Sequence, residues 1–198
     1  MTKWIYLAST GVIGLACAFT IPQSTPKPVK PAVSAMKHAN QNPMIKRGEY
    51  LVTIMGCGDC HAPKKLTPQG PVPDRDRFLS GYNSAEPLGN YDKDLVKTGQ
   101  WVVFNGQNTA FVGPWGVSFA ANLTPDATGI GDWSFEQFDK AMRKGKFKGL
   151  DNSRPLLPPM PWPNYSNMAD ADMKAVFAYL KSLKPVSNAV PANIPPAP

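Results

Sequence analysis

Cysteine and histidine are scarce in this 198-residue chain, which has three cysteines and two histidines. Cys57, Cys60 and His61 stand together, so the only further residues of these two types are Cys17 and His38. A structural zinc site needs four ligands of this kind, and a Cys-x-x-Cys pair supplies only half of them. The shortage of further ligands argues against zinc at Cys57 and Cys60.

Acidic residues are also few, with 14 Asp and Glu against 21 Lys and Arg and a net charge of +7. A basic surface suits nucleic acid, anionic lipid or an acidic protein partner. No nucleic-acid-binding motif accompanies the charge, so we expect no nucleic acid as partner. The charge instead favours solubility and electrostatic docking to another protein.

The string Cys57-Gly58-Asp59-Cys60-His61 has the Cys-x-x-Cys-His pattern of covalent c-type haem attachment. Two thiols at this spacing lie on the same side of a helical turn, where they can add to the two vinyl groups of one porphyrin. The following imidazole is then held under the iron as the proximal ligand. A thioredoxin-like redox pair needs no such histidine and belongs in a βαβ context, which is absent. The motif predicts one covalent haem c on Cys57, Cys60 and His61.

The sixth ligand of the iron decides what such a haem can do, and Met160 is the first candidate. It lies in Pro158-Pro159-Met160-Pro161, where prolines on both sides fix the backbone and exclude a helix. A rigid loop suits a thioether that must stay on iron through oxidation and reduction. Met168 is the alternative ligand, and a buried filler of a surface loop is the alternative role for Met160. Ligation by His61 and Met160 would leave no open site, which predicts electron transfer rather than enzymatic chemistry.

Three helices are readable in the sequence. The first runs from Pro43 to the haem motif, the second spans Ser134–Gly145 and the third spans Asp170–Leu183. Residues 62–133 between them carry no strong periodicity apart from a short hairpin that begins at Trp101–Gly106. Stretches this long without regular structure are usually functional, so we expect this one to wrap the haem.

The N-terminus has the pattern of an export signal, with Lys3 followed by an apolar run. Export agrees with haem attachment, which takes place outside the cytoplasm, and predicts a periplasmic protein. Leu15-Ala16-Cys17 resembles a lipoprotein signal, and lipidation of Cys17 would account for the third cysteine. Cleavage after Ala18 and an uncleaved anchor over residues 4–21 are the alternatives. Lipidation and anchoring each predict a membrane tether.

These features together resemble the class I-like bacterial cytochromes c, in which a helix, the haem motif, a long loop, a methionine loop and a terminal helix follow one another. A narrower resemblance rests on five further segments, which are Gly113–Ser118, Ala121–Asp126, Gly129–Trp133, Pro159–Pro161 and Phe177–Leu180. They resemble single haem domains in the multihaem cytochrome subunits of membrane-bound alcohol and gluconate dehydrogenases. This resemblance covers roughly residues 44–184 and implies thioether bonds at Cys57 and Cys60, axial ligation by His61 and Met160, and electron transfer.

The chain departs from that family in two ways. It has a single haem motif, so one redox centre requires a redox partner on either side: a donor dehydrogenase or quinol oxidase, and a downstream oxidase or cytochrome. The last helix begins after Ala169, where the family usually has a capping Ser or Thr, and the loss of that cap costs about 1 kcal/mol of stability.

The alternative function is a haem enzyme, or a peroxide- or nitric-oxide-binding protein, with a labile sixth ligand.

The expected fold is mainly α, a cytochrome c-like arrangement of three or more helices around a covalent haem, with long irregular loops. The expected organisation is a signal or anchor at residues 1–20, a Pro-rich linker at 21–43, the cytochrome c domain at 44–186 and a Pro-rich tail at 187–198. The 22 prolines, which exceed the 16 glycines, favour the irregular loops and the extended ends.

Overall fold

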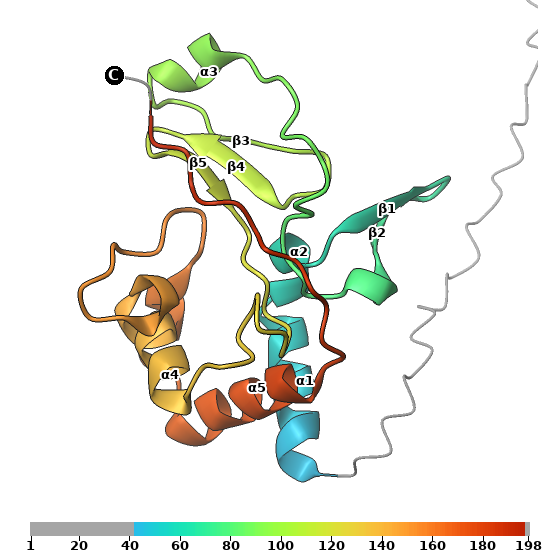
Figure 1. Cartoon of the computed structure of the whole chain (residues 1–198), viewed down its shortest axis with the longest axis vertical. Helices are drawn as coiled ribbons and strands as arrows, with labels where there is room; N and C mark the ends of the chain where they lie inside the picture. Colours follow the sequence, from blue (N-terminus) through green and yellow to red (C-terminus); the bar gives the residue numbers. More distant parts are fainter. Residues whose placement is uncertain (1–41, 197–198) are drawn as a thin grey trace, which may run out of the picture. The chain divides into compact units, whose positions relative to one another are not determined.

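The computed structural model describes residues 42–196, and Figure 1 shows how their elements are arranged. The expected signal and Cys17 lie outside these residues. Strands β1 and β2 form one antiparallel sheet, and strands β3, β4 and β5 form a second antiparallel sheet in that order. The helices are α1 (Pro43–Ile54), α2 (Cys57–His61), α3 (Lys93–Lys97), α4 (Phe135–Lys144) and α5 (Asp170–Ser182), with 3-10 turns η1 (Arg75–Arg77), η2 (Phe147–Gly149) and η3 (Trp162–Tyr165). The strands are β1 (Lys64–Thr67), β2 (Gly70–Pro73), β3 (Val103–Phe104), β4 (Ala110–Gly113) and β5 (Gly116–Phe119).

The three expected helices are confirmed as α1, α4 and α5, and their ends follow the capping signals in the sequence. Ser134 and Gln137 form the capping box of α4, which ends at Gly145 in the left-handed conformation. Helix α5 begins after Ala169, whose side chain makes no capping hydrogen bond. The start of α5 therefore relies on the acidic residues of its first turn, which favour the positive end of the helix dipole.

Helices α1 and α5 pack against each other at very short range. A Cβ atom on Gly48 would lie 2.0 Å from the carbonyl oxygen of Ala175 and 2.7 Å from the Cβ of Tyr179, so only glycine fits at this crossing. At its edge, Arg47 Nε donates to Asp172 Oδ1 over 2.8 Å. The main core is made of apolar side chains from α1, α4, α5 and the loops between them: Leu51, Val52, Leu79, Ile130, Phe138, Met142, Met173, Ala175, Val176, Tyr179, Leu180 and Leu183.

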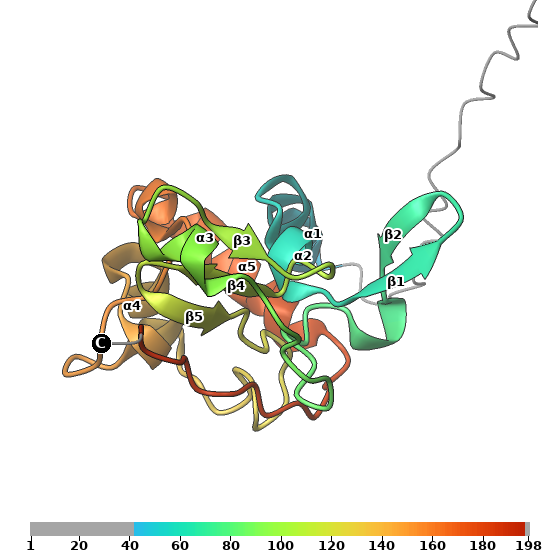
Figure 2. The ribbon, with the colours of Figure 1, turned by 90° about the horizontal axis from the view of Figure 1, so that it is seen from above.

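The long middle of the chain holds more strands than its sequence indicates. The expected hairpin is present, since Val103 and Phe104 pair with Val112 and Phe111 of β4. Hairpin β1–β2 was not expected, because its second strand contains two prolines and neither strand alternates polar with apolar residues. Figures 1 and 2 both show this hairpin extending away from the helices.

The chain returns from α5 to the sheet of β3, β4 and β5, where Ile194 forms a β-bridge with Val117 of β5 (Figure 1). Asn188 fastens this returning segment and is only 4% exposed. Its Nδ2 donates to the carbonyl oxygens of Ser80 and Tyr82, each over 2.7 Å. The segment after α5 is thus extended but packed, and the boundaries predicted for a domain and a tail stay predictions.

Replacing Asn188 with alanine leaves those two buried carbonyls without a donor. We expect Asn188→Ala to lower the free energy of unfolding by about 3 kcal/mol, measured by denaturant titration. Ser187→Ala, at the exposed neighbouring position, is the control and changes stability by less than about 0.5 kcal/mol. Equal stabilities of the two variants would contradict this role for Asn188.

Candidate functional site

The Cys-x-x-Cys-His motif forms the short helix α2, which follows directly on α1. Cys57 and Cys60 are both partly buried free thiols. Burial raises the pKa of Cys57 to about 11 and also raises the pKa of Cys60. A thiol-disulfide exchange pair needs a thiol with a lowered pKa, so the surroundings of α2 do not favour that alternative.

The imidazole of His61 is fixed by one hydrogen bond. Its Nδ1 lies 2.8 Å from the carbonyl oxygen of Ala121. A carbonyl oxygen can only accept, so Nδ1 carries the hydrogen and Nε2 keeps its lone pair. Burial also lowers the pKa of His61, which favours the neutral ring at pH 7. In this tautomer the Nε2 lone pair of His61 could serve as a metal ligand.

The Ala121 carbonyl oxygen lies within hydrogen-bond distance of His61 because three backbone segments pack directly together, at His61, at Gly81–Tyr82 and at Ala120–Ala121. Gly81 N donates to the carbonyl oxygen of His61 over 2.7 Å, and Tyr82 N donates to that of Ala120 over 2.9 Å. Gly81 has φ 80°, and a Cβ there would lie 2.4 Å from the Ala120 oxygen and 2.6 Å from the Ala121 carbonyl carbon. Glycine at position 81 thus permits both the turn and the close approach.

The segment that carries Ala121 is held by its own polar side chains. Asn122 is buried, and its Oδ1 accepts from the backbone and the hydroxyl of Thr124 over 2.9 and 2.8 Å. Its Nδ2 donates to the carbonyl oxygen of Val186 over 2.8 Å, in the segment after α5. Asn122 and Thr124 therefore help to fix the position of the Ala121 carbonyl oxygen, which is the acceptor for His61.

The loop of Met160 is tied to β5. Ser118 Oγ donates to the carbonyl oxygen of Pro158 over 2.7 Å and accepts from Trp115 Nε1 over 3.2 Å. Met160 is partly buried at the border of the main core, which Cys57 and Met168 also contact. The structure thus brings the Met160 loop and the first cysteine of the motif to the same core.

The chain that leaves Met160 returns to the motif through Tyr165 at the end of η3. The Tyr165 hydroxyl donates to the carbonyl oxygen of Met55 over 3.4 Å. Burial raises the pKa of Tyr165, and the nearby Cys57 and Cys60 raise it further. These contacts place Tyr165 close to both ends of the Cys-x-x-Cys pair.

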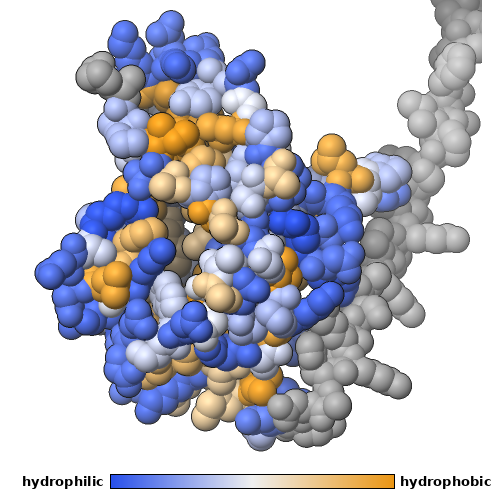
Figure 3. All heavy atoms as spheres, viewed as in Figure 1, coloured by the Kyte–Doolittle hydropathy of each residue, from blue (hydrophilic) through white to orange (hydrophobic). Residues whose placement is uncertain are grey.

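The surface around these elements is partly apolar. Figure 3 shows apolar side chains over the sheet of β3, β4 and β5 and on hairpin β1–β2, where Leu66 is 84% exposed. The same view shows the surface hollowed between that sheet and the α4 side of the molecule. The exposed apolar surface of Leu66 and of the sheet belongs to the long middle segment, which also forms one side of the hollow.

Two further observations concern metal ions and membranes. Within residues 42–196, no three side chains of the types His, Cys, Asp or Glu come close enough together to hold a metal ion. No helix in this same range has the length and apolar character needed to cross a bilayer. The anchor predicted for residues 4–21 lies outside the described range.

Some residues of the site could not be found in the sequence. Ala121 acts through its backbone carbonyl, so its side chain gives no signal. Lys64 and Asn108 donate from their side chains to carbonyl oxygens of α2, and Asn108 Nδ2 reaches that of Asp59 over 2.8 Å. The only available signal was that the Ala121–Asp126 segment resembles a family motif.

Comparison with known proteins found several relatives of this chain. No protein-family model matches the chain. It is 33% identical over 148 residues to the gluconate 2-dehydrogenase cytochrome c subunit of Pantoea cypripedii, a match that covers 74% of this chain and 25% of that protein. It is 29% identical over 158 residues to the fructose dehydrogenase cytochrome subunit of Gluconobacter japonicus, covering 79% and 25% respectively. It is 27% identical over 146 residues to the cytochrome c subunit of the alcohol dehydrogenase (quinone) of Gluconobacter oxydans, covering 73% and 22%.

The matches make the chain a relative of bacterial cytochrome c subunits. More narrowly, it is homologous to the cytochrome subunits of gluconate, fructose and alcohol dehydrogenases, as its sequence motifs indicate. The chain spans about a quarter of the length of these curated relatives.

Gly81 offers a test of how the His61 bond is built. Gly81→Ala adds a Cβ that collides with the backbone of Ala120 and Ala121, whereas Gly89 has the same left-handed conformation with nothing within 4 Å. We expect Gly89→Ala to lower the unfolding free energy by about 1–2 kcal/mol, the strain of the left-handed conformation. Gly81→Ala should cost about 2 kcal/mol more because of the collision. Equal losses for the two variants in denaturant titrations would show that the close approach at Gly81 is unimportant.

Proposed function

We propose that this chain is a one-electron carrier with a cytochrome c-like fold and one haem c. In this proposal Cys57 and Cys60 form the thioether bonds, and His61 and Met160 are the axial ligands of the iron. When bound, the haem supplies a reversible one-electron couple. The observation that carries the proposal is the 2.8 Å hydrogen bond between His61 Nδ1 and the Ala121 carbonyl oxygen. This histidine directly follows Cys60, and both Cys57 and Cys60 are free thiols.

The donor set fits the group. Thioether formation consumes two free thiols on one helical turn, and α2 presents Cys57 and Cys60 in that way. Iron ligation requires a neutral imidazole with a lone pair, and the Ala121 carbonyl leaves His61 in that state. These residues would attach the haem and supply one ligand of its iron.

Met160 is the proposed second ligand because its loop is held in place. The Ser118–Pro158 hydrogen bond and the prolines around Met160 restrict how far its thioether can move. A fixed ligand limits reorganisation between the two oxidation states, as electron transfer requires. With both axial positions filled, peroxide, nitric oxide and oxygen have no open site. An iron with a labile sixth ligand would instead favour the alternative of a haem enzyme or a small-ligand-binding protein.

The partners and the location follow from this role and from the relatives. A single redox centre must receive its electron from one protein and pass it to another. The homologues are cytochrome subunits of dehydrogenases, so we propose a dehydrogenase or quinol oxidase as donor and an oxidase or second cytochrome as acceptor. We also propose that the protein is exported to the periplasm and tethered to a membrane, with Cys17 lipidated or residues 4–21 retained.

Methionine ligation can be tested by substitution. Met160→Ala removes the sulfur, so the weak long-wavelength sulfur-to-iron charge-transfer band of the ferric protein should vanish and the reduction potential should fall. The ferrous variant should also bind carbon monoxide, which the wild type excludes. Met168→Ala is the matched control and should keep the band and the potential. Loss of the band in Met168→Ala alone would transfer the ligand role to Met168. High-spin ferric haem in the wild type would favour the alternative function.

The membrane tether can be tested at the mature N-terminus. A lipidated Cys17 becomes the first residue and adds acyl mass, which mass spectrometry of the protein purified from membranes detects. Cys17→Ser removes the thiol that is acylated, so the added acyl mass should be absent from this variant. An unmodified chain cleaved after Ala18, soluble in both forms, would contradict the tether.

A further inference from the structure

Lys64 lies three residues after the haem motif, at the start of β1, and its side chain turns back onto α2. Its Nζ donates to the carbonyl oxygens of Gly58 over 3.1 Å, Asp59 over 3.0 Å and Ala62 over 2.5 Å. All three oxygens belong to the motif helix or to the residue that ends it. The Gly58 oxygen also accepts from Ala62 N, and the Asp59 oxygen also accepts from Asn108 Nδ2. Lys64 therefore adds a charged donor to carbonyls at the end of the helix.

The three hydrogen bonds show that the Lys64 side chain is a protonated ammonium group. Only an ammonium has three N–H donors, so Nζ bears its full positive charge while all three bonds are made. The side chain is partly buried, and its charge lies against the backbone that joins the two cysteines and the histidine. A cation at the C-terminal end of a helix is also favoured by the helix dipole.

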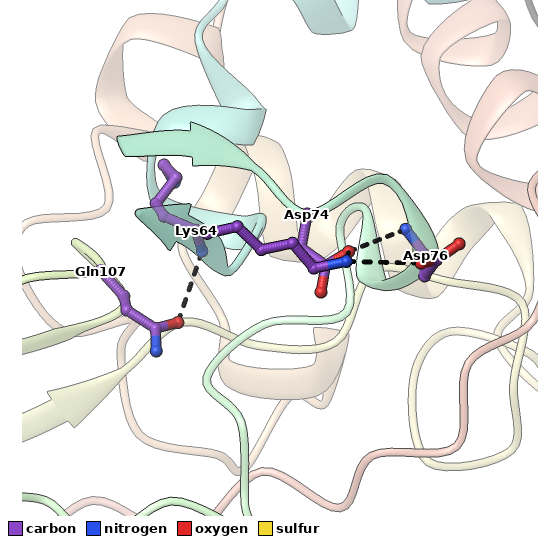
Figure 4. Close-up of polar contacts among 5 residues, drawn as sticks. Lys64, Asp74, Asp76 and Gln107 are labelled. Carbon is purple, nitrogen blue, oxygen red and sulfur yellow. Dashed lines mark hydrogen bonds and ion pairs between the residues drawn. The ribbon is translucent and has the colours of Figure 1, made fainter. Parts of the chain in front are cut away.

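Lys65 is adjacent in the chain but has a different environment. Its Nζ pairs with Asp74 over 2.8 Å and with Asp76 over 3.4 Å, and its side chain is 58% exposed. Figure 4 shows Asp74 and Asp76 at one end of this group of contacts and Gln107 at the other, with Lys64 between them. The two neighbouring lysines thus differ in their partners: Lys64 contacts backbone carbonyls of α2, whereas Lys65 contacts acidic side chains.

We propose that Lys64 is a positioning residue of the redox centre, whose ammonium group holds the end of α2 and whose fixed charge favours the reduced state. The inference rests on the proposed function, since it concerns a haem attached to α2. The reduced centre carries one positive charge fewer than the oxidised centre. A nearby cation therefore repels the reduced form less, and because Lys64 is partly buried, water and salt screen this repulsion only in part.

The test compares the midpoint potentials of full-length, haem-loaded variants by spectroelectrochemistry. We expect Lys64→Met to lower the potential, so that the ratio of reduced to oxidised protein at the wild-type midpoint falls about threefold or more. Lys65→Met removes the same charge from the same strand and is the control, with a smaller shift that added salt removes. Lys64→Arg keeps the charge and should keep most of the potential. Lys64→Gln removes the charge but retains N–H donors, so it replaces Lys64→Met if that variant does not fold.

The outcomes separate this inference from the proposed function. A lower potential for Lys64→Met and Lys64→Gln, with Lys64→Arg close to the wild type, would support it. Full haem content with equal potentials in the Lys64 and Lys65 variants would overturn the inference and leave electron transfer intact. A loss of stability in Lys64→Met or Lys64→Gln without any shift in potential would also overturn it, since Lys64 would then serve the helix alone. A wild-type chain without covalent haem would overturn both.

Discussion

The hydrogen bond from His61 Nδ1 to the Ala121 carbonyl joins the motif helix to a loop sixty residues later in the chain. Much of the described structure serves to keep that acceptor in place. Gly81 allows its backbone to pack directly against that of Ala120 and Ala121, and Asn122 ties the acceptor loop to the segment after α5. A histidine held in this way presents one defined nitrogen, which a metal ligand requires.

The scaffold around this bond combines an apolar core with polar fastenings. Helices α1, α4 and α5 build the main core and set the position of α2, which follows α1 directly. The proline-rich loops are also held by polar side chains: Asn188, Ser118 and Asn122 each donate hydrogen bonds to backbone carbonyls. A loop fastened by a few such bonds is rigid as long as each bond remains, because an unpaired buried carbonyl is costly.

The sequence predicts the elements whose causes are local. Ser134, Gln137 and Gly145 mark the ends of α4, and the spacing of Cys57, Cys60 and His61 indicates the kind of site. The rest depends on backbone groups brought together by folding. The Ala121 carbonyl and the three carbonyls bound by Lys64 have no signature in side-chain patterns. Hairpin β1–β2 escapes prediction for a different reason, since its prolines are typical of a loop.

We propose that α2 carries one covalent haem, and intact-mass measurement under denaturing conditions distinguishes covalent attachment from coordination alone. Denaturant removes a haem held by coordination alone, whereas thioether bonds at Cys57 and Cys60 keep it on the chain. We expect the mass of the mature chain plus one haem, and the loss of that added mass when both cysteines are replaced by alanine. A haem-free mass from protein made with an active haem-attachment system would contradict it.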